Sequence, residues 1–323
     1  MLNTLSSYFD VFMDALRTVA SHIFFLEPLT HDEFIFRPFF TILILGIVSG
    51  VLGVLVNLRK LEFISEGIIH SIFPGIILGF VLFNGVTGIV PGAIFIGIIA
   101  AFVFTTSTKH ESTSEALIAL TLTAFFGIGI VIVTYVKDMS GQLEALLFGR
   151  LLAVTSPLAT QTFIVCALSI ILVAFMWKEL VFRAFDPVTY QSCGYRIFIS
   201  DLLLNISLTF AIVAASTAVG TLLAIGYVII PPATAKLVCN KISTMIPVSI
   251  FVAIFSGYLG LMAVVLFSDY AELSPQAMVI CSMTLLYALA YVVRYVKNKK
   301  SKVSSDNKNK TFELAENKQV GIV

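Results

Sequence analysis

The chain has 323 residues, of which 58% are hydrophobic and only 12% are charged. In soluble globular domains about a quarter of the residues are charged, so this composition excludes a soluble domain and belongs to the membrane class. The formal net charge is +1, and no basic patch indicates a nucleic-acid partner. We therefore expect a multi-pass protein of the lipid bilayer.

Residues 1–38 contain several charged side chains and no uninterrupted apolar stretch before a cleavage site. We therefore expect no cleavable signal peptide. Residues 2–26 favour an amphipathic helix that lies at the membrane surface. The sequence thus predicts an N-terminal amphipathic, extracellular segment over residues 1–38.

A helix needs about 20 apolar residues to cross the bilayer. Apolar stretches that meet or approach this length are residues 39–58, 63–83, 89–106, 116–136, 158–177, 202–235, 246–268 and 276–293. Helices are expected because an open strand or a loop in lipid leaves its backbone groups unpaired. The predicted fold class is an all-α, polytopic helical membrane protein.

The stretch 202–235 is too long for a single crossing. Gly220 and Gly226 interrupt it, and neither Pro231 nor Pro232 can continue a helix without a break. We predict a helix to about residue 218, a turn, and a shorter helix broken near Pro231 and Pro232. The alternative is one helix plus a re-entrant piece, so the predicted number of crossings is eight or nine.

The distribution of lysine and arginine predicts the orientation, because cytoplasmic loops are enriched in both. One set of loops carries Arg59, Lys60, Lys109, Lys178, Arg183, Arg196, Lys236 and Lys241, whereas the alternate set carries Arg17, Arg37, Lys137 and Arg150. We therefore expect the first set in the cytoplasm and the N-terminus outside. The chain then divides into a membrane domain over residues 39–296 and a disordered cytoplasmic tail over 297–323.

Cysteines and most histidines have an ordinary interpretation. The cysteines fit neither a disulfide framework nor a metal site and are expected to be small buried hydrophobes: Cys166, Cys193, Cys239 and Cys281. Three histidines lie outside the expected core and are not expected to be ligands: His22, His31 and His110.

Two pairs of polar residues lie near helix ends. Asp201 and Asn205 are one turn apart at the start of a predicted helix, where we expect a solvated cytoplasmic end. Asp269 and Glu272 flank an outside loop. They are either ordinary solvated acids or a means of attracting cations to an entrance.

Glu66 and His70 interrupt the second apolar stretch. A helix that starts after Lys60 carries Glu66 roughly 9 Å and His70 roughly 15 Å inward at 1.5 Å per residue, and the hydrocarbon core is about 30 Å thick. A charged group near the midplane is costly unless it has a partner or faces a cavity. The spacing of four residues puts both side chains on one face, where a carboxylate and an imidazole suit zinc, manganese or ferrous iron.

Pro74 and Gly75 follow this pair directly. Pro74 lacks the N–H that would bond the carbonyl of His70, and Gly75 permits close backbone approach. Transporters often place their substrate sites at broken helices near the midplane. The alternative is that Glu66 and His70 pair with each other or with neighbouring polar groups and bind nothing.

This region resembles the membrane permease subunits of ABC importers for zinc, manganese and iron. In that family a basic pair ends the first helix and the motif Gly-Asp-Ala-x-Ser-His-Ala-x-x-Pro-Gly follows. Here Arg59-Lys60 precedes "SEGIIHSIFPG" at residues 65–75, which matches the histidine, the Pro-Gly and the acid four residues before the histidine. Glu66 replaces the family's aspartate, and Ser65 and Ile69 are two further departures. The longer acid can still coordinate a metal, with an altered preference.

Further segments match landmarks of the same family in order along residues 37–296. They are "GQLEALLFGRLLAV" at 141–154, "KELVFRAFDPVTYQSCG" at 178–194, "VGTLLAIGYVIIPPATAKL" at 219–237, "SGYLGL" at 256–261 and "ELSPQA" at 272–277. The third segment has Pro232 where alanine is usual. Residues 1–36 and the tail are not explained by the resemblance.

The resemblance implies a transport subunit and not an enzyme, located in a bacterial inner or plasma membrane. It implies three protein partners: an extracellular metal-binding protein, a second permease chain, by default a copy of this one, and a cytoplasmic ABC ATPase that holds the ATP. The sequence agrees in having no G-x-x-x-x-G-K-[ST] phosphate loop. No cofactor is expected on this chain besides the divalent metal ion that it transports by alternating access.

The segment 178–194 resembles the family's cytoplasmic Phe-Asp-Pro loop, which implies contact with the ATPase. Phe185 is the candidate anchor, and Asp186 and Pro187 are expected to start a short coupling helix as its N-cap and first residue. Gly194 closes the segment. An ordinary amphipathic linker is the alternative.

Two other classes of function remain. An ion-coupled secondary transporter could use the same pair to carry protons, and its activity would need no ATPase. An intramembrane enzyme is disfavoured, because H-E-x-x-H and G-x-S-x-G are both absent and His70 is the one histidine expected at core depth.

Overall fold

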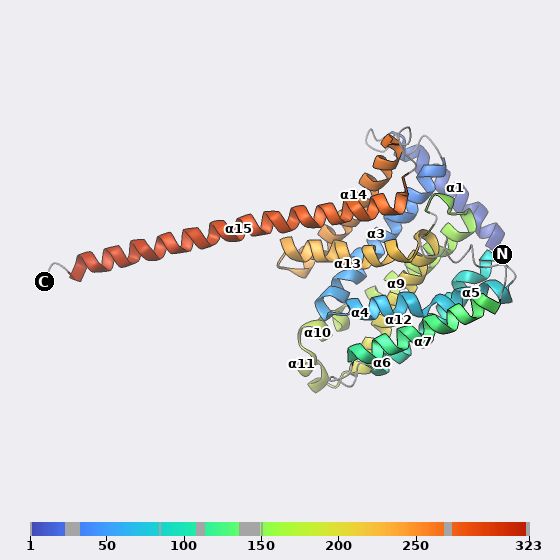
Figure 1. Ribbon diagram of the computed structural model, residues 1–323, viewed down its shortest axis with the longest axis horizontal. Helices are drawn as coiled ribbons and strands as arrows, with labels where there is room; N and C mark the ends of the chain where they lie inside the picture. The colour runs from blue at the N-terminus through green and yellow to red at the C-terminus, as the bar shows by residue number, and fades with distance from the viewer. Residues whose placement is uncertain are drawn as a thin grey trace.

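The protein is a bundle of membrane-spanning helices, shown by a computed structural model in Figure 1. The structure describes residues 2–22, 33–83, 85–107, 114–135, 149, 151–267 and 273–320, and within them it contains helices and no strand. Several predictions fall outside the described residues, namely those for His31, Lys109, His110, Lys137, Arg150, Asp269 and Glu272 and for most of the segment 141–154.

The described helices follow one another along the chain. Their bounds are α1 Leu2–Ala20, α3 Glu33–Arg59, α4 Glu62–Ser71, α5 Phe73–Leu82, α6 Ile89–Ser107, α7 Ser114–Tyr135, α9 Ser156–Phe175, α10 Trp177–Phe185, α11 Pro187–Ser192, α12 Ile197–Val219, α13 Thr221–Val238, α14 Ile242–Phe267 and α15 Pro275–Val320. Two 3-10 turns, η1 Val86–Gly88 and η2 Leu151–Ala153, lie between them.

Nine of the described helical segments are long and apolar enough to cross a membrane. Each predicted apolar stretch corresponds to one segment, except that the longest stretch contains two, so the all-α polytopic prediction is confirmed at nine crossings. The pair α4 and α5 counts as one crossing of 21 residues, Glu62–Leu82. Within lipid these helices satisfy their own backbone groups, which accounts for the absence of other structure in the described part.

The break in the longest stretch lies at Gly220 and not at the two prolines. Gly220 has φ of 95°, a left-handed conformation that glycine adopts without a steric penalty. α13 then runs as a helix through Pro231 and Pro232. The predicted turn near residue 218 is therefore confirmed, whereas the helical assignment has no interruption at the prolines. Proline inside a spanning helix is tolerated where neighbouring helices pack against the bend, and α3 packs there, with Gly53 beside the Val228 carbonyl and the ring of Pro232.

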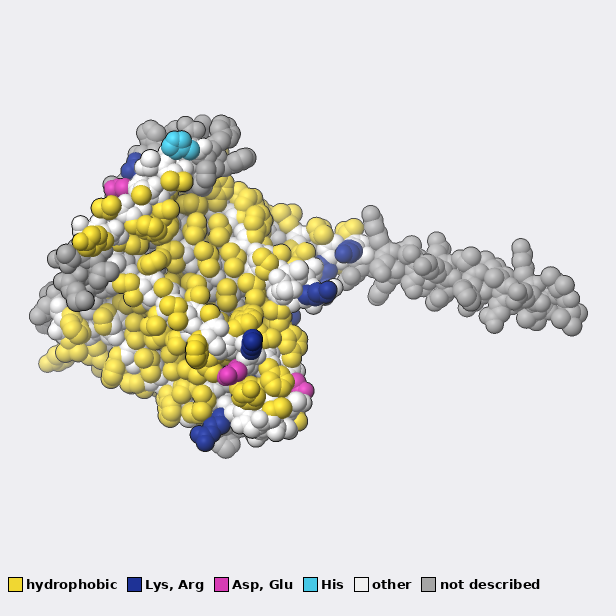
Figure 2. Space-filling model, turned by 180° about the vertical axis from the view of Figure 1, so that it is seen from behind, with side chains coloured by type: hydrophobic (Ala, Val, Ile, Leu, Met, Phe, Trp, Pro, Cys, Tyr) yellow, Lys and Arg dark blue, Asp and Glu magenta, His cyan; other side chains and the backbone are white. Residues whose placement is uncertain are grey.

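The core forms where α3, α12, α13 and α14 meet, with α4 and α6 packed against α12. Large fully buried side chains fill it, including Leu52, Ile68, Phe104 and Tyr227. Hydrophobic side chains cover most of the face shown in Figure 2, where charged side chains are few. A surface of this kind fits lipid hydrocarbon and not water.

The predictions for the N-terminal helix and for the C-terminal tail have different outcomes. Residues 2–20 form the predicted N-terminal helix, α1. The tail from residue 297, predicted to be disordered, continues α15 as a helix to Val320, beyond the bundle (Figure 1). It contains neither proline nor glycine before Gly321, and lysine and glutamate are good helix formers.

Gly75 supplies a close contact between α5 and α6. A Cβ on Gly75 would lie 2.5 Å from the carbonyl oxygen of Gly92 and 2.8 Å from Cβ of Ile96. Small residues of this kind allow helix backbones to approach closely in membranes. The sequence prediction that Gly75 permits close backbone approach is therefore confirmed.

We expect Gly75→Ala to lower the free energy of unfolding by about 1–3 kcal/mol, because the added methyl group overpacks the α5–α6 contact. Gly127→Ala is the matched control, since Gly127 is also helical but has open space around its Cβ position. Thermal unfolding of both variants in detergent measures the difference. Equal stability of the two variants would contradict the proposed packing.

Candidate functional site

Glu66 and His70 lie on α4, immediately before a change of helix. α4 ends at Ser71, Ile72 forms a one-residue turn, and α5 begins at Phe73 with Pro74 in its first turn. The N–H of Ile72 donates to Ile68 O at 3.1 Å and is also directed at the carbonyl of His70. The helix break predicted at Pro74 and Gly75 lies slightly earlier, at Ile72, and the N–H of Ile72 is directed at the carbonyl that Pro74 leaves free.

His70 lies near the middle of its crossing. The segment Glu62–Leu82 has eight residues before His70 and twelve after it. Glu66 lies one turn closer to the end at which α4 follows α3. This is a position along the helical segment, and the depth of His70 in the bilayer stays a prediction.

The face of α4 that carries this pair is turned toward α7. Glu66 and His70 are half-buried, whereas Gly67, Ile68 and Ile69 between them are buried. The imidazole of His70 meets the ring of Phe126 edge-on, with centroids 5.7 Å apart. α7 is the least buried of the nine spanning segments described. The pair therefore lies near an edge of the bundle and not at its centre.

One chain supplies only part of a metal site. Within the described residues no group of three or more His, Cys, Asp or Glu side chains comes together. Glu66 is the charged neighbour of His70, so the two provide one carboxylate and one imidazole. A bound ion would take its remaining ligands from water, backbone carbonyls or another chain.

At one end of the bundle the segment 178–194 lies on α10 and α11, of which α11 is the predicted short helix. Asp186 accepts a hydrogen bond from the N–H of Thr189 at 2.9 Å, and Pro187 begins α11, so the predicted N-cap and first residue are confirmed. Hydrogen bonds from the side chain and backbone of Thr189 hold the pKa of Asp186 below its ordinary value. The carboxylate therefore stays ionised as a cap, as an N-terminal position favours.

Apolar side chains stand exposed around this cap. Phe185 is 66% exposed and Val188 is 74% exposed. Gly194, with φ of 86°, turns the chain after α11. Tyr190, by contrast, is buried and stacks on Tyr195 at 4.8 Å, which fixes α11 against the chain that follows it. Phe185 and Val188 are therefore exposed on a segment whose position is fixed by packing.

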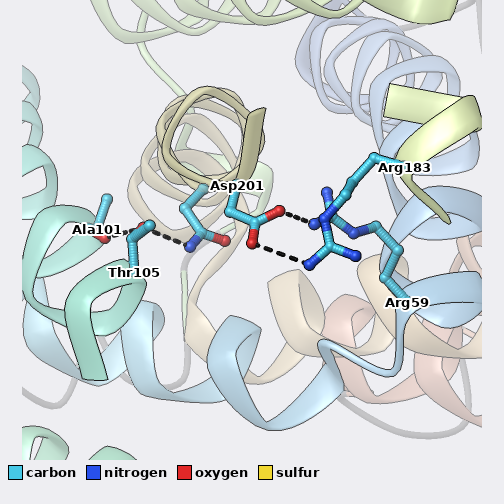
Figure 3. A network of polar contacts seen from close by, with 6 residues as sticks. Arg59, Ala101, Thr105, Arg183 and Asp201 are labelled. Carbon is cyan, nitrogen blue, oxygen red and sulfur yellow. Dashed lines mark hydrogen bonds and ion pairs between the residues drawn. The ribbon is translucent and has the colours of Figure 1, made fainter. Parts of the chain in front are cut away.

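Asp201 on α12 links this end to two other elements. Its carboxylate pairs with Arg59, at the end of α3, and with Nη2 of Arg183, on α10, at 3.3 Å. Figure 3 shows both guanidinium groups directed at it. The Arg59 side chain is only 7% exposed and that of Asp201 19%. Lys60, with φ of 55°, then turns the chain from α3 into α4.

Asn205 lies one turn after Asp201 and is buried. Its Nδ2 donates to Oγ1 of Thr105 on α6 at 2.8 Å, and that hydroxyl donates to Ala101 O at 2.6 Å. The expectation of a solvated helix end for Asp201 and Asn205 is therefore wrong. Both residues bond to partners distant in sequence, which an i to i+4 pattern along one helix does not reveal.

Arg59, Arg183, Asp201 and Asn205 line a cavity of about 290 Å³ at this end of the bundle. Sequence reasoning missed this group of residues. The sequence offered one signal for it: Asp201 lies at the start of a predicted helix on the cytoplasmic side, where Arg59 and Arg183 were also expected.

The other minor predictions have mixed outcomes. Of the four free cysteines, Cys166 is buried as expected, Cys239 is half-buried, and Cys193 and Cys281 are exposed. His22 is exposed after α1, away from the core, as expected.

Comparison with known proteins identifies the family. The family model of the ABC 3 transport family matches residues 31–294. The manganese transport system membrane protein MntC of Listeria monocytogenes is 31% identical over 269 residues, covering 83% of this chain and 93% of that protein. The manganese import system permease protein ScaB of Streptococcus gordonii is 29% identical, covering 85% and 98%.

A solved structure has the same fold. PsaBC from Streptococcus pneumoniae, determined in complex with a Fab, contains a chain that matches with a TM-score of 0.73 and 27% identity. The match covers 85% of this chain and 98% of that chain.

Because the family match spans most of the chain, this protein belongs to the ABC 3 transport family. It is a polytopic membrane permease of a bacterial ABC importer, and its ATPase is a separate chain. It is therefore a transport subunit and not an enzyme. α1 lies outside the matched residues.

We expect Asp201→Asn to lower the free energy of unfolding by about 2–3 kcal/mol, because it leaves Arg59 without its counter-charge in a mostly buried position. The ion pair of Asp201 with Arg183 contributes less, because both side chains are partly exposed and solvent screens their attraction. Thermal unfolding measures the loss. Glu179→Gln on α10 is the control for removing one acid near the same end. If both variants unfold like the wild type, the ion pairs do not stabilise this end of the bundle.

Proposed function

We propose that this chain forms the path by which an ATP-driven importer carries a divalent metal ion across the membrane, and that Glu66 and His70 hold the ion on its way. The observation that carries the proposal is one carboxylate and one imidazole on the same half-buried face, at mid-membrane and beside the turn at Ile72. Ionisable residues at that depth are costly, so they mark ion paths in transport proteins.

Manganese is the ion that we propose first. The relatives MntC and ScaB are named for manganese. Carboxylate oxygen and water suit manganese, and a single imidazole does not prevent its binding. Zinc and ferrous iron also accept these ligands, so a series of ions has to be compared.

We propose that a second copy of the chain completes the path. The half-buried face of Glu66 and His70 lies beside the most exposed of the described spanning segments, and one chain offers two side-chain ligands. A copy packed along this edge would cover the exposed face and enclose the ion. An extracellular metal-binding protein would deliver the ion to this path.

We propose that α10 and α11 receive the motion of the ATPase. Phe185 and Val188 offer an exposed apolar anchor on a helix capped by Asp186 and Pro187. Displacement of α10 would move Arg183, and Asp201 connects Arg183 to Arg59 at the start of the turn into α4. This chain of contacts would join ATP hydrolysis to alternating access at Glu66 and His70.

Mutation of the two proposed ligands tests the assignment. In proteoliposomes with the ATPase and binding protein, we expect Glu66→Gln and His70→Ala each to reduce manganese uptake by about tenfold or more, since each removes a direct ligand. Glu62→Gln, one turn earlier on α4, is the matched control and should transport normally. Unchanged uptake in both ligand variants would overturn the site.

The same assay separates the proposal from an ion-coupled secondary transporter. An importer driven by ATP should carry no manganese when the ATPase is omitted or when nucleotide is absent. Uptake that continues without nucleotide and follows the pH gradient would instead support the secondary transporter.

A further inference from the structure

α1 has three distinct faces, and the bundle covers only one of them. The buried face consists of Phe9, Met13, Leu16 and Ala20, which pack against the bundle. Positions spaced by three, four and seven residues share a face of a helix. A second face, with the same spacing, is apolar but exposed and consists of Tyr8, Val11, Phe12, Ala15 and Val19. The third face is polar and exposed and consists of Ser7, Asp14, Thr18 and Ser21.

The exposed apolar face is extensive for a helix outside the spanning segments. Tyr8 is 77% exposed, Val11 68% and Val19 66%. Contiguous apolar surface of this kind marks contact with a partner or a membrane. The exposed polar face beside it indicates that α1 is not surrounded by lipid or apolar protein on all sides.

Aromatic contacts fix the level of α1 along the bundle. Phe9 meets Phe40 of α3 with centroids 6.1 Å apart and Phe163 of α9 at 5.9 Å. Phe40 and Phe163 each lie seven residues after the first residue of their helices, Glu33 and Ser156. Seven residues correspond to about 10 Å along a helix. α1 therefore lies slightly inside the ends of the spanning helices, opposite the end that carries α10.

The exposed apolar face borders α3, where Phe12 meets Phe40 with ring centroids 6.4 Å apart, and Phe9 joins α1 to the exposed apolar surface of α9. Beside Phe163, the side chains of Ile164, Leu168 and Ile171 are 44%, 44% and 62% exposed on a spanning helix. In Figure 2 the hydrophobic surface extends from the upper left, where α1 lies, onto the spanning helices. An ion pair of 3.6 Å between Asp10 and Arg37 of α3 lies on the polar side.

From this geometry we propose that α1 is an interfacial helix whose Tyr8, Phe12 and Val19 face inserts into the outer leaflet of the membrane, while its Ser7 and Asp14 face meets water. Interfacial helices bury their apolar side about 5–10 Å into the boundary between headgroups and acyl chains, which is the level found for Phe9. The choice of the outer leaflet rests on the prediction from the distribution of lysine and arginine that the N-terminus lies outside. Residues before 31 lie outside the family match.

Tryptophan fluorescence tests the insertion directly, because Trp177 is the one tryptophan of the chain. In a Trp177→Phe background, single tryptophans are introduced as Tyr8→Trp, Phe12→Trp and, for the polar face, Ser7→Trp. The full-length protein is reconstituted in vesicles of phosphatidylcholine with or without brominated acyl chains. The Trp177→Phe parent supplies the blank, and gel filtration checks that each variant is folded.

We expect brominated lipid to quench the Tyr8→Trp and Phe12→Trp proteins at least about twofold more strongly than the Ser7→Trp protein, as partial insertion requires. Acrylamide, a quencher dissolved in water, should give the opposite order. Equal quenching of the three positions by brominated lipid would overturn the proposal. Protection of Tyr8→Trp and Phe12→Trp from both quenchers would also overturn it, because a protein partner or a second copy would then cover the face.

Discussion

Lipid hydrocarbon offers no hydrogen bonds, and this constraint governs both the fold and the site. Every backbone N–H and carbonyl within the bilayer must find a partner inside the protein, so the described chain crosses as helices. The same constraint makes each ionisable side chain at depth costly. Glu66 and His70 stand out because they place a carboxylate and an imidazole within a mostly apolar crossing.

The spanning helices are interrupted at two turns, and these turns leave few backbone groups without a hydrogen bond. At Ile72 the chain passes from α4 to α5 while the N–H of Ile72 still bonds to Ile68 and that of Ile76 to Ile72. At Gly220 the turn uses a residue that tolerates a positive φ. The crossing that carries Glu66 and His70 is therefore interrupted near its middle without a loop in lipid.

The ion pairs of Asp201 connect the start of α4 to the end of the bundle that carries α10 and α11. Asp201 holds Arg183 on α10 and Arg59 at the end of α3, and only Lys60 and Leu61 separate Arg59 from α4. Breaking one of these pairs leaves a mostly buried charge without its partner, which is destabilising. In the mechanism that we propose, the same three side chains therefore serve both stability and transport.

Local sequence signals predicted much of this arrangement. Apolar length predicted the spans, Pro74 predicted the interruption after Glu66 and His70, and Asp186-Pro187 predicted the start of α11, because each signal acts over a few residues. The pairing of Asp201 with Arg59 and Arg183 could not be predicted, since the partners are far apart in sequence and meet only through helix packing. The predicted break at Pro231 and Pro232 was wrong for the same reason, because the packing of α3 against these prolines could not be read from the sequence.

The most direct measurement is the anomalous scattering of manganese in the assembled importer, recorded above and below the manganese absorption edge. The account predicts a peak of density within bonding distance of the carboxylate of Glu66 and of a ring nitrogen of His70. A peak inside the membrane that touches neither side chain would contradict it.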